Sequence, residues 1–119
     1  MKAREIVEDI RVRNTGIEEE ILYSTIKILE KELMQYGEFK EREFNEDAQL
    51  YAPEEFKEMY IERLMREAAL RREDWDCYNA HNTLYNAKLK EYRAYIIRND
   101  AAKHKRIGTE QSFKNDWRW

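Results

Sequence analysis

The chain has 119 residues, of which 42% are hydrophobic and 39% charged, with a formal net charge of −3. This composition is typical of one folded domain with a modest core, and it excludes a disordered acidic chain. The net charge gives no reason to expect tight binding of nucleic acid. No apolar run is long enough to span a membrane, and the first ten residues lack the apolar block of a signal peptide, so we expect a cytosolic protein that does not bind membranes.

Two helices are predicted in the N-terminal third of the chain. The first, residues 2–12, rests on apolar residues spaced as on one helical face, namely Ala3, Ile6, Val7 and Ile10. The second is expected over residues 16–36, because Thr15 followed by Glu18 has the pattern of a capping box. Gly37 is suited to the C-terminal stop of this helix.

Residues 39–51 have no helical stripe, and we expect a loop there with short β-strands at most. Pro53 is suited to the first turn of a third helix, which is predicted over residues 53–71. A charged break follows, and a fourth helix is predicted over residues 74–98. The expected fold class is therefore all-α, with four principal helices.

The predicted fourth helix contains a heptad-like seam, in which mostly apolar residues recur at alternating steps of three and four. Its members are Trp75, Tyr78, Asn82, Tyr85, Leu89, Tyr92 and Ile96. Asparagine is unfavourable inside a helix, so Asn82 on this seam, and Asn79 and Asn86 beside it, need an explanation. A buried amide can set how helices align, and we predict that Asn79 and Asn86 form hydrogen bonds between helices. The alternative is that the amides face water.

The sequence divides into a helical domain, residues 1–98, and a C-terminal tail or docking segment, residues 99–119. The apolar periodicity stops near Ile97, yet the tail contains basic and large aromatic residues: Lys103, Lys105, Arg106, Phe113, Trp117 and Trp119. Disordered tails normally lack large aromatic residues. These side chains are therefore interpreted as anchors for a partner's pocket, or as residues that dock back onto the domain's own core.

Charge is distributed unevenly along the chain. Residues 38–58 are strongly acidic, whereas the tail begins with a basic cluster. This asymmetry suggests two surfaces with different partners, and solvated faces account for it equally well.

The sequence lacks the patterns that mark common catalytic, cofactor and metal sites. Its three glycines are isolated, so it has no phosphate-binding loop, and its two histidines lack the spacing of metal ligands. The single cysteine, Cys77, is expected to pack as a small hydrophobic residue, because no third group orients His81 toward it. We therefore expect no enzymatic activity, no cofactor and no metal ion.

A set of patterned positions extends over most of the chain. They comprise the opening helix MKAREIVEDIRVRN, the helix EEEILYSTIKILEKEL, and then Leu50, Pro53, Phe56, Tyr60, Tyr78-Asn79, Tyr85-Asn86-Ala87 and Tyr92. This pattern resembles a family of small helical head–tail connector proteins, also called adaptor or head completion proteins, of long-tailed bacteriophages and Gram-positive prophages. The chain departs from the family pattern by placing charged residues throughout its third helix.

The resemblance implies a structural role in virion assembly. Subunits of this family form a homo-oligomeric ring under the portal protein, usually twelve-fold to match the portal. The ring extends the channel through which DNA passes, and it supports the next connector or a tail-completion protein. The implied location is the virion neck, after assembly in the host cytoplasm. Residues 38–58 are a candidate lining of the channel.

The family's C-terminal segment typically reaches toward the portal, and here that segment corresponds to residues 99–119. We expect it to be loosely placed in the isolated subunit and to become ordered against the portal. Two interpretations from other classes stay open. One is a phage-encoded helical module that binds a host protein through its acidic surface, and the other is a small nucleic-acid-binding regulator that uses Lys103, Lys105 and Arg106.

Overall fold

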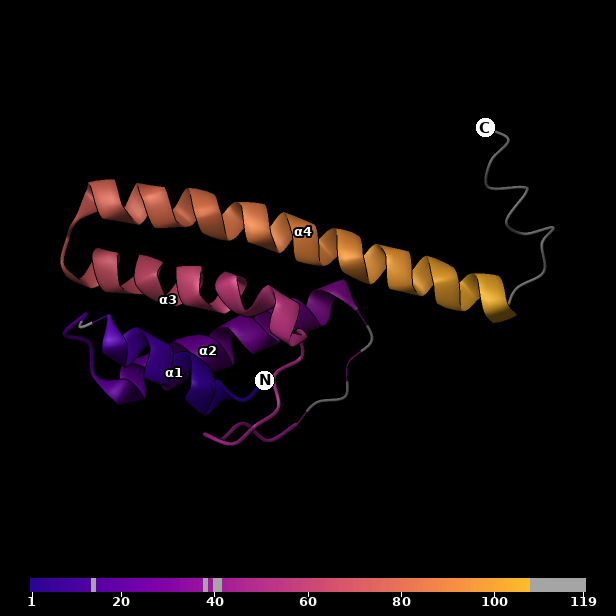
Figure 1. Ribbon diagram of the computed structural model, residues 1–119, viewed down its shortest axis with the longest axis horizontal. Helices are drawn as coiled ribbons and strands as arrows, with labels where there is room; N and C mark the ends of the chain where they lie inside the picture. Colours follow the sequence, from indigo (N-terminus) through magenta and orange to yellow (C-terminus); the bar gives the residue numbers. More distant parts are fainter. Residues whose placement is uncertain (14, 38, 40–41, 108–119) are drawn as a thin grey trace.

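The computed structural model describes residues 1–13, 15–37, 39 and 42–107, with side chains described as far as residue 99. Its helices are α1 (Ala3–Val12), α2 (Glu19–Leu33), α3 (Lys57–Arg71) and α4 (Trp75–Ile107), with the 3-10 turns η1 (Met34–Tyr36) and η2 (Glu54–Phe56). The predicted all-α fold of four helices is confirmed (Figure 1). In the described part of the loop after α2, β structure amounts to an isolated antiparallel bridge between Lys2 and Gln49.

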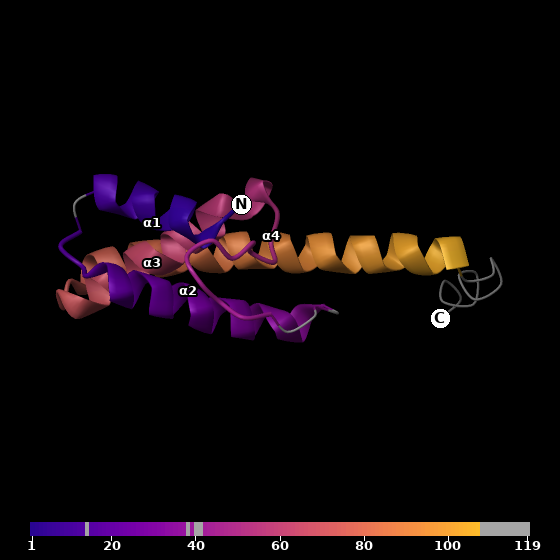
Figure 2. The ribbon, with the colours of Figure 1, turned by 90° about the horizontal axis from the view of Figure 1, so that it is seen from below.

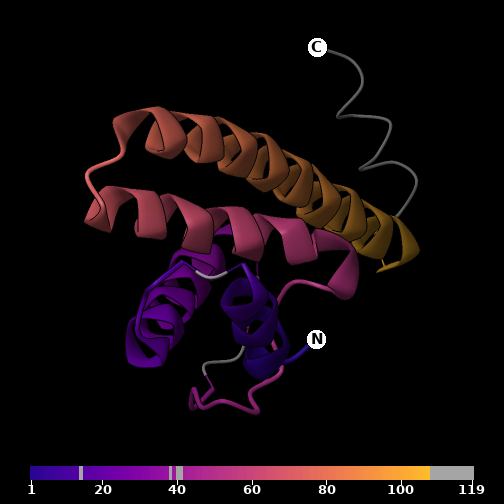
Figure 3. The same cartoon turned by 60° about the vertical axis from the view of Figure 1, so that its left-hand side comes forward.

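The central element of the fold is α3. α1 and α2 pack on one side of it, and α4 runs antiparallel to it on the other side (Figure 1, Figure 3). All four helices contribute to one core, whose largest fully buried side chains include Ile6, Ile10, Leu22, Ile26, Leu29, Met59, Tyr60, Leu64 and Tyr92. The apolar stripes of the sequence therefore converge on α3 from both sides.

The loop before α3 packs against the start of α1. The backbone N–H groups of Ala3 and Arg4 donate to the carbonyls of Ala48 and Glu46, at 3.2 and 2.9 Å. These loop carbonyls satisfy donors that the first turn of a helix leaves unpaired. The Arg4 guanidinium adds ion pairs with Glu46 and Asp47. Two acids of the segment 38–58 therefore bind a basic side chain of the same chain.

The start of α2 differs from the prediction. The helix begins at Glu19, its N-cap is Glu18 without a side-chain cap bond, and the predicted Thr15–Glu18 capping box is wrong. The reason lies at Gly16, whose φ of +75° is in the left-handed region and cannot continue into a right-handed helix.

The predicted break between the third and fourth helices is confirmed, and its hydrogen bonds account for its position. The N–H groups of Glu73 and Asp74 donate to the carbonyls of Leu70 and Ala69, at 3.1 and 3.0 Å, which is a Schellman motif. Glu73 has the positive φ of 56° that this motif requires. The Asp74 carboxylate then accepts a hydrogen bond from the Cys77 N–H at 3.2 Å and so caps α4.

The predicted end of the fourth helix is wrong, because α4 continues beyond residue 98 to Ile107. Residues 99–107 contain good helix formers such as alanine, lysine and arginine, and Gly108 follows them. The boundary predicted between a domain of residues 1–98 and a tail of residues 99–119 therefore falls inside one helix. Phe113, Trp117 and Trp119 lie outside the described residues.

Candidate functional site

The seam predicted in α4 faces α3. Tyr85 and Tyr92 are buried on it, and Tyr78, Asn82, Leu89 and Ile96 are partly buried. Trp75, at the start of the helix, is the exception, with 56% of its surface exposed. The heptad-like pattern therefore joins two helices of the same chain.

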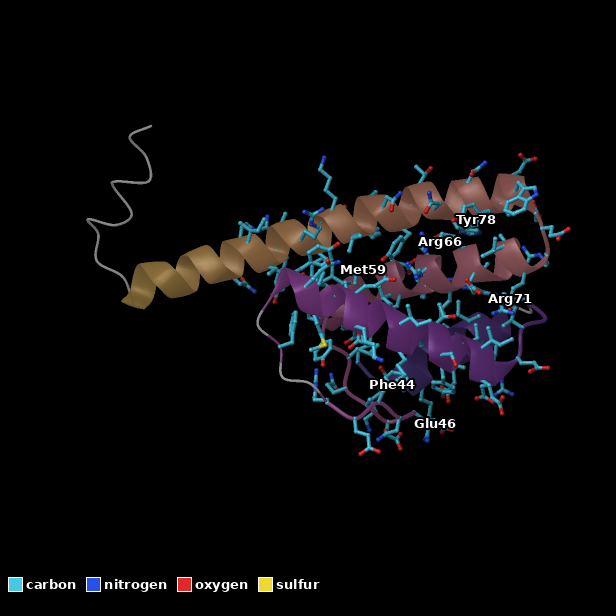
Figure 4. All side chains as sticks on the ribbon, turned by 180° about the vertical axis from the view of Figure 1, so that it is seen from behind. Phe44, Glu46, Met59, Arg66, Arg71 and Tyr78 are labelled. Atoms are coloured by element: carbon cyan, nitrogen blue, oxygen red, sulfur yellow. The ribbon has the colours of Figure 1, made fainter. Side chains whose placement is uncertain are left out.

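Arg66 of α3 is the polar centre of this interface. Its Nη1 donates a 2.8 Å hydrogen bond to Oδ1 of Asn82, and its guanidinium carbon lies 4.9 Å from the ring centre of Tyr85 and 5.9 Å from that of Tyr78. Figure 4 places Arg66 and Tyr78 between the two helices. A guanidinium stacks on aromatic faces while keeping its N–H donors free for an amide, so Arg66 connects the amide and the rings of α4.

The prediction for Asn79 and Asn86 is wrong. Both residues are exposed, and within the part of the chain that the structure describes no hydrogen bond joins either side chain to another helix. The amide that joins two helices is Asn82, which lies on the seam itself. Asn79 and Asn86 lie beside the seam of α4, and residues in such positions point away from the neighbouring helix. Asn82 lies on the seam and therefore faces α3.

Two further polar pairs hold α3 in place. Arg63 forms a two-pronged ion pair with Glu32 of α2, with both N–O distances at 3.3 Å, and stacks 5.4 Å from the ring centre of Tyr85. His81 Nδ1 of α4 lies 2.6 Å from the Glu62 carboxylate. The charged residues of α3 thus serve contacts between helices.

The Cys77 thiol contacts Asp74 at the start of α4. A hydrogen bond to the Asp74 carboxylate raises the pKa of this thiol, and burial raises it further. A raised pKa favours the protonated thiol, which is the opposite of an activated nucleophile.

A buried polar cluster surrounds Glu30 of α2, a residue that is not among the predicted site residues. The Glu30 carboxylate accepts a hydrogen bond of 2.5 Å from the Tyr60 hydroxyl and one of 2.9 Å from the Tyr51 N–H. The Tyr60 hydroxyl also accepts from the Ala52 N–H at 3.3 Å. The available signal was the position of Glu30, which falls on the same helical face as Ile26 and Leu33.

The electrostatics of this cluster follow from its burial. Burial raises the pKa of Glu30, and its hydrogen bonds with Tyr60 and Tyr51 oppose the increase. Burial and the nearby Glu30 carboxylate also raise the pKa of Tyr60, which therefore remains a hydrogen-bond donor. The Tyr92 hydroxyl is buried as well, and it has no hydrogen-bond partner among the described residues.

A cleft opens beside Glu30, between α2 and the loop before α3. Its volume is about 360 Å³, and its walls combine cationic, apolar and aromatic side chains with two acids and an amide. The lining residues are Lys27, Glu30, Lys31, Met34, Arg42, Glu43, Phe44, Ala48, Gln49 and Tyr51. Phe44 lies on the loop that passes below α2 in Figure 4. We call this space the α2 cleft.

The C-terminal part of α4 projects past the other three helices (Figure 1, Figure 2). Ile97 lies near the start of this projection, and 66% of its surface is exposed. The predicted docking residues Lys103, Lys105 and Arg106 belong to the projecting helix. The structure thus separates them from the helix-packing residues Tyr78, Asn82, Tyr85 and Tyr92.

The described residues contain no cluster of three or more metal-ligating side chains. Within the same residues, no helix is both long and apolar enough to cross a membrane. We compared the chain with protein-family models, with curated proteins and with solved structures, and none of them matches it.

Proposed function

We propose that this protein is a structural subunit of a phage head–tail connector, which forms a ring under the portal in the virion neck. Its partners are further copies of itself, the portal protein and the next connector or tail-completion protein, and DNA passes through the ring. The resemblance described above supports this role. Of the residues that carry it, Leu50, Phe56, Tyr60, Tyr85 and Tyr92 are all buried, so the pattern coincides with the core of the fold.

The projection of α4 is the observation that carries the proposal. α4 has 33 residues and a length of about 50 Å, whereas the antiparallel α3 has 15 residues and a length of about 22 Å. A helical segment without tertiary neighbours is only marginally stable in water. A further protein surface that covers the projecting end would stabilise it, and Ile97 supplies an apolar contact for such a surface.

The charges at the two ends of the molecule support a contact between copies. The projecting end has Lys103, Lys105 and Arg106, and the exposed acids Glu18 and Glu20 lie where α2 starts, at the opposite end (Figure 2). A contact between different surfaces of identical subunits is heterologous, and it closes into a ring when the rotation allows. A contact between the basic cluster of one copy and the acids at the start of α2 in the next copy is favoured by their opposite charges.

The test uses the full chain, alone and mixed with the portal protein encoded in the same genome. Native mass spectrometry and electron microscopy should detect a closed ring, either alone or on the portal. Ile97→Asp should prevent assembly, because it places a charge in the proposed contact. Leu84→Asp is the matched control, since Leu84 is also exposed on α4 and lies away from both the projection and the start of α2. A wild-type chain that neither forms rings nor binds the portal would contradict the proposal.

A second arm tests the charges of the projecting end. The triple variant Lys103→Glu, Lys105→Glu, Arg106→Glu should fold like the wild type, as judged by circular dichroism, but assemble less. Raising the salt concentration should weaken assembly of the wild type in the same direction, because salt screens exposed charges. Assembly that is unaffected by either change would remove the basic cluster from the proposed interface.

A further inference from the structure

We propose that the α2 cleft binds the aromatic segment 108–119 of the same chain, with the indole of Trp117 or Trp119 as the anchor. This inference does not depend on the connector function. It selects one of the two interpretations that the sequence left open for the aromatic tail, namely docking on the domain's own surface. It differs from the expectation of a loosely placed tail in the isolated subunit, and the experiment below distinguishes the two.

The lining of the cleft matches the chemistry of an indole. Met34, Phe44 and Tyr51 provide apolar and aromatic surface, and a thioether makes favourable contacts with aromatic rings. Lys27, Lys31 and Arg42 provide cations, which are attracted to the face of tryptophan more strongly than to other rings. Arg42 already stacks 4.5 Å from the ring centre of Tyr51, so one aromatic–cation pair is present in the wall.

The cleft also offers acceptors for the indole N–H. The Glu30 carboxylate and the Gln49 amide both line it, and an indole N–H is a donor without acceptor capacity. The volume of about 360 Å³ lies in the range of about 300–1,000 Å³ that is typical of ligand pockets. One large side chain with its neighbouring backbone therefore suits the space.

The length of the segment allows it to return to the cleft. The Arg93 guanidinium lies 4.9 Å from the ring centre of Tyr36, which places this part of α4 beside the end of α2. From there α4 extends 14 residues, about 21 Å, to Ile107. The ten residues from Ile107 to Trp117 can span up to about 35 Å. This exceeds the return path along α4 combined with one helix diameter of about 10 Å, which leads to Tyr36 at the end of α2. Trp119 lies two residues further along the chain and adds about 7 Å of reach, toward Met34 and Lys31 in the wall of the cleft.

Docking of the tail in the α2 cleft would affect any partner that binds the same aromatic residues. An aromatic residue held in the α2 cleft is not available to another protein's pocket. Any partner that binds the same tryptophans must displace them from the cleft first. Its apparent Kd is then its intrinsic Kd divided by the fraction of chains in which the cleft is open. The tail then acts as a competitor for its own binding partner.

Tryptophan fluorescence tests the proposal directly. The chain has three tryptophans, so Trp75→Phe leaves Trp117 and Trp119 as the reporters. In this background we expect blue-shifted emission, and a quenching constant for acrylamide several-fold lower than that of a free peptide of residues 108–119. Arg42→Ala and Phe44→Ala should each raise the quenching constant toward that of the peptide. Lys90→Ala, an exposed cation on α4, is the matched control and should leave it unchanged.

Every outcome of this experiment decides the question. Quenching equal to that of the free peptide would overturn the proposal. Protection that neither Arg42→Ala nor Phe44→Ala reduces would place the tryptophans elsewhere and overturn it as well. Protection that disappears on dilution would assign the cleft to the tail of a second copy. Because Phe44→Ala can disturb the loop, Arg42→Ala is the decisive variant, and circular dichroism verifies that both variants are folded.

Discussion

The Tyr60 hydroxyl of α3 and the Glu30 carboxylate of α2 form a buried hydrogen bond of 2.5 Å. It joins two helices at a point where the core is otherwise apolar. Glu30 also binds the Tyr51 N–H, and Tyr60 binds the Ala52 N–H, so the pair fixes the loop before α3. A buried polar group without such partners would be costly, and here each member satisfies the other.

Tyr60→Phe should lower the free energy of unfolding by about 1–3 kcal/mol, because it leaves Glu30 with one donor fewer and Ala52 without its acceptor. Tyr92→Phe is the matched change, since the Tyr92 hydroxyl is buried and unpaired among the described residues. Its removal should leave stability unchanged or increase it. Urea denaturation of the three proteins measures both effects. Equal losses from the two variants would mean that the Glu30–Tyr60 bond has no special role.

The raised pKa of Glu30 predicts a dependence of stability on pH. Burial raises the folded-state pKa above its ordinary value of 4.5, so the folded protein binds this proton more tightly than the unfolded chain. The contribution of Glu30 is therefore most favourable below the unfolded pKa, and it decreases as pH rises through the folded pKa.

Glu30→Gln removes the titration and keeps a similar shape. From about pH 4 to about pH 7, the free energy of unfolding of the wild type should fall relative to that of the variant. Urea denaturation at several pH values measures this difference. A difference that is constant or that grows with pH would show that burial does not raise the pKa of Glu30.

The three asparagines of α4 should respond differently to alanine. Asn82→Ala should lower the free energy of unfolding by about 1 kcal/mol, because Arg66 loses its partner at the interface of α3 and α4. Asn79→Ala and Asn86→Ala change exposed positions, where alanine has the better helix propensity. These two variants should therefore be neutral or slightly stabilising. Thermal unfolding followed by circular dichroism distinguishes them, and a loss at Asn79 or Asn86 as large as that at Asn82 would contradict the assignment.

Glu73→Gly should stabilise the protein by up to about 1 kcal/mol. Glu73 has a φ of 56° at the end of α3, and glycine adopts this conformation without the strain that a Cβ introduces. The exposed side chain loses little on removal. Gly16→Ala makes the opposite change at a φ of +75°, and it should destabilise by a similar amount. If both variants are neutral, backbone strain at these positions does not affect stability.

Local signals in the sequence were sufficient for much of the fold. The apolar spacing of α1 and α3 identified both helices to within a few residues, because a helical stripe is a property of neighbours three and four positions apart. The break before α4 is predicted from another local signal, the run of charged residues Arg72, Glu73 and Asp74 between two apolar stripes. The start of α2 was missed, because the Thr15–Glu18 pattern fits a cap while the backbone at Gly16 prevents one.

The predicted end of the fourth helix shows the limit of periodicity. An apolar stripe ends where a helix loses its packing partner, and α4 passes beyond α3 near that point. The helix itself continues through residues whose intrinsic propensity is high. The apolar pattern and the helix therefore end at different residues. The projection of α4 depends on where its packing partner α3 ends, which the sequence of α4 does not contain.

The sequence by itself determined the all-α class, the seam of α4 and the break before it, because these depend on contacts within a few turns of one helix. Only the tertiary structure decided that Asn82 joins the helices through Arg66, and that Glu30 is buried against Tyr60. The partners of these side chains are 16 and 30 residues away in the chain, so no local pattern encodes them. Their pairing follows from the packing of α2, α3 and α4, which brings the two members of each pair together and shields them from water, largely at Glu30–Tyr60 and partly at Arg66–Asn82.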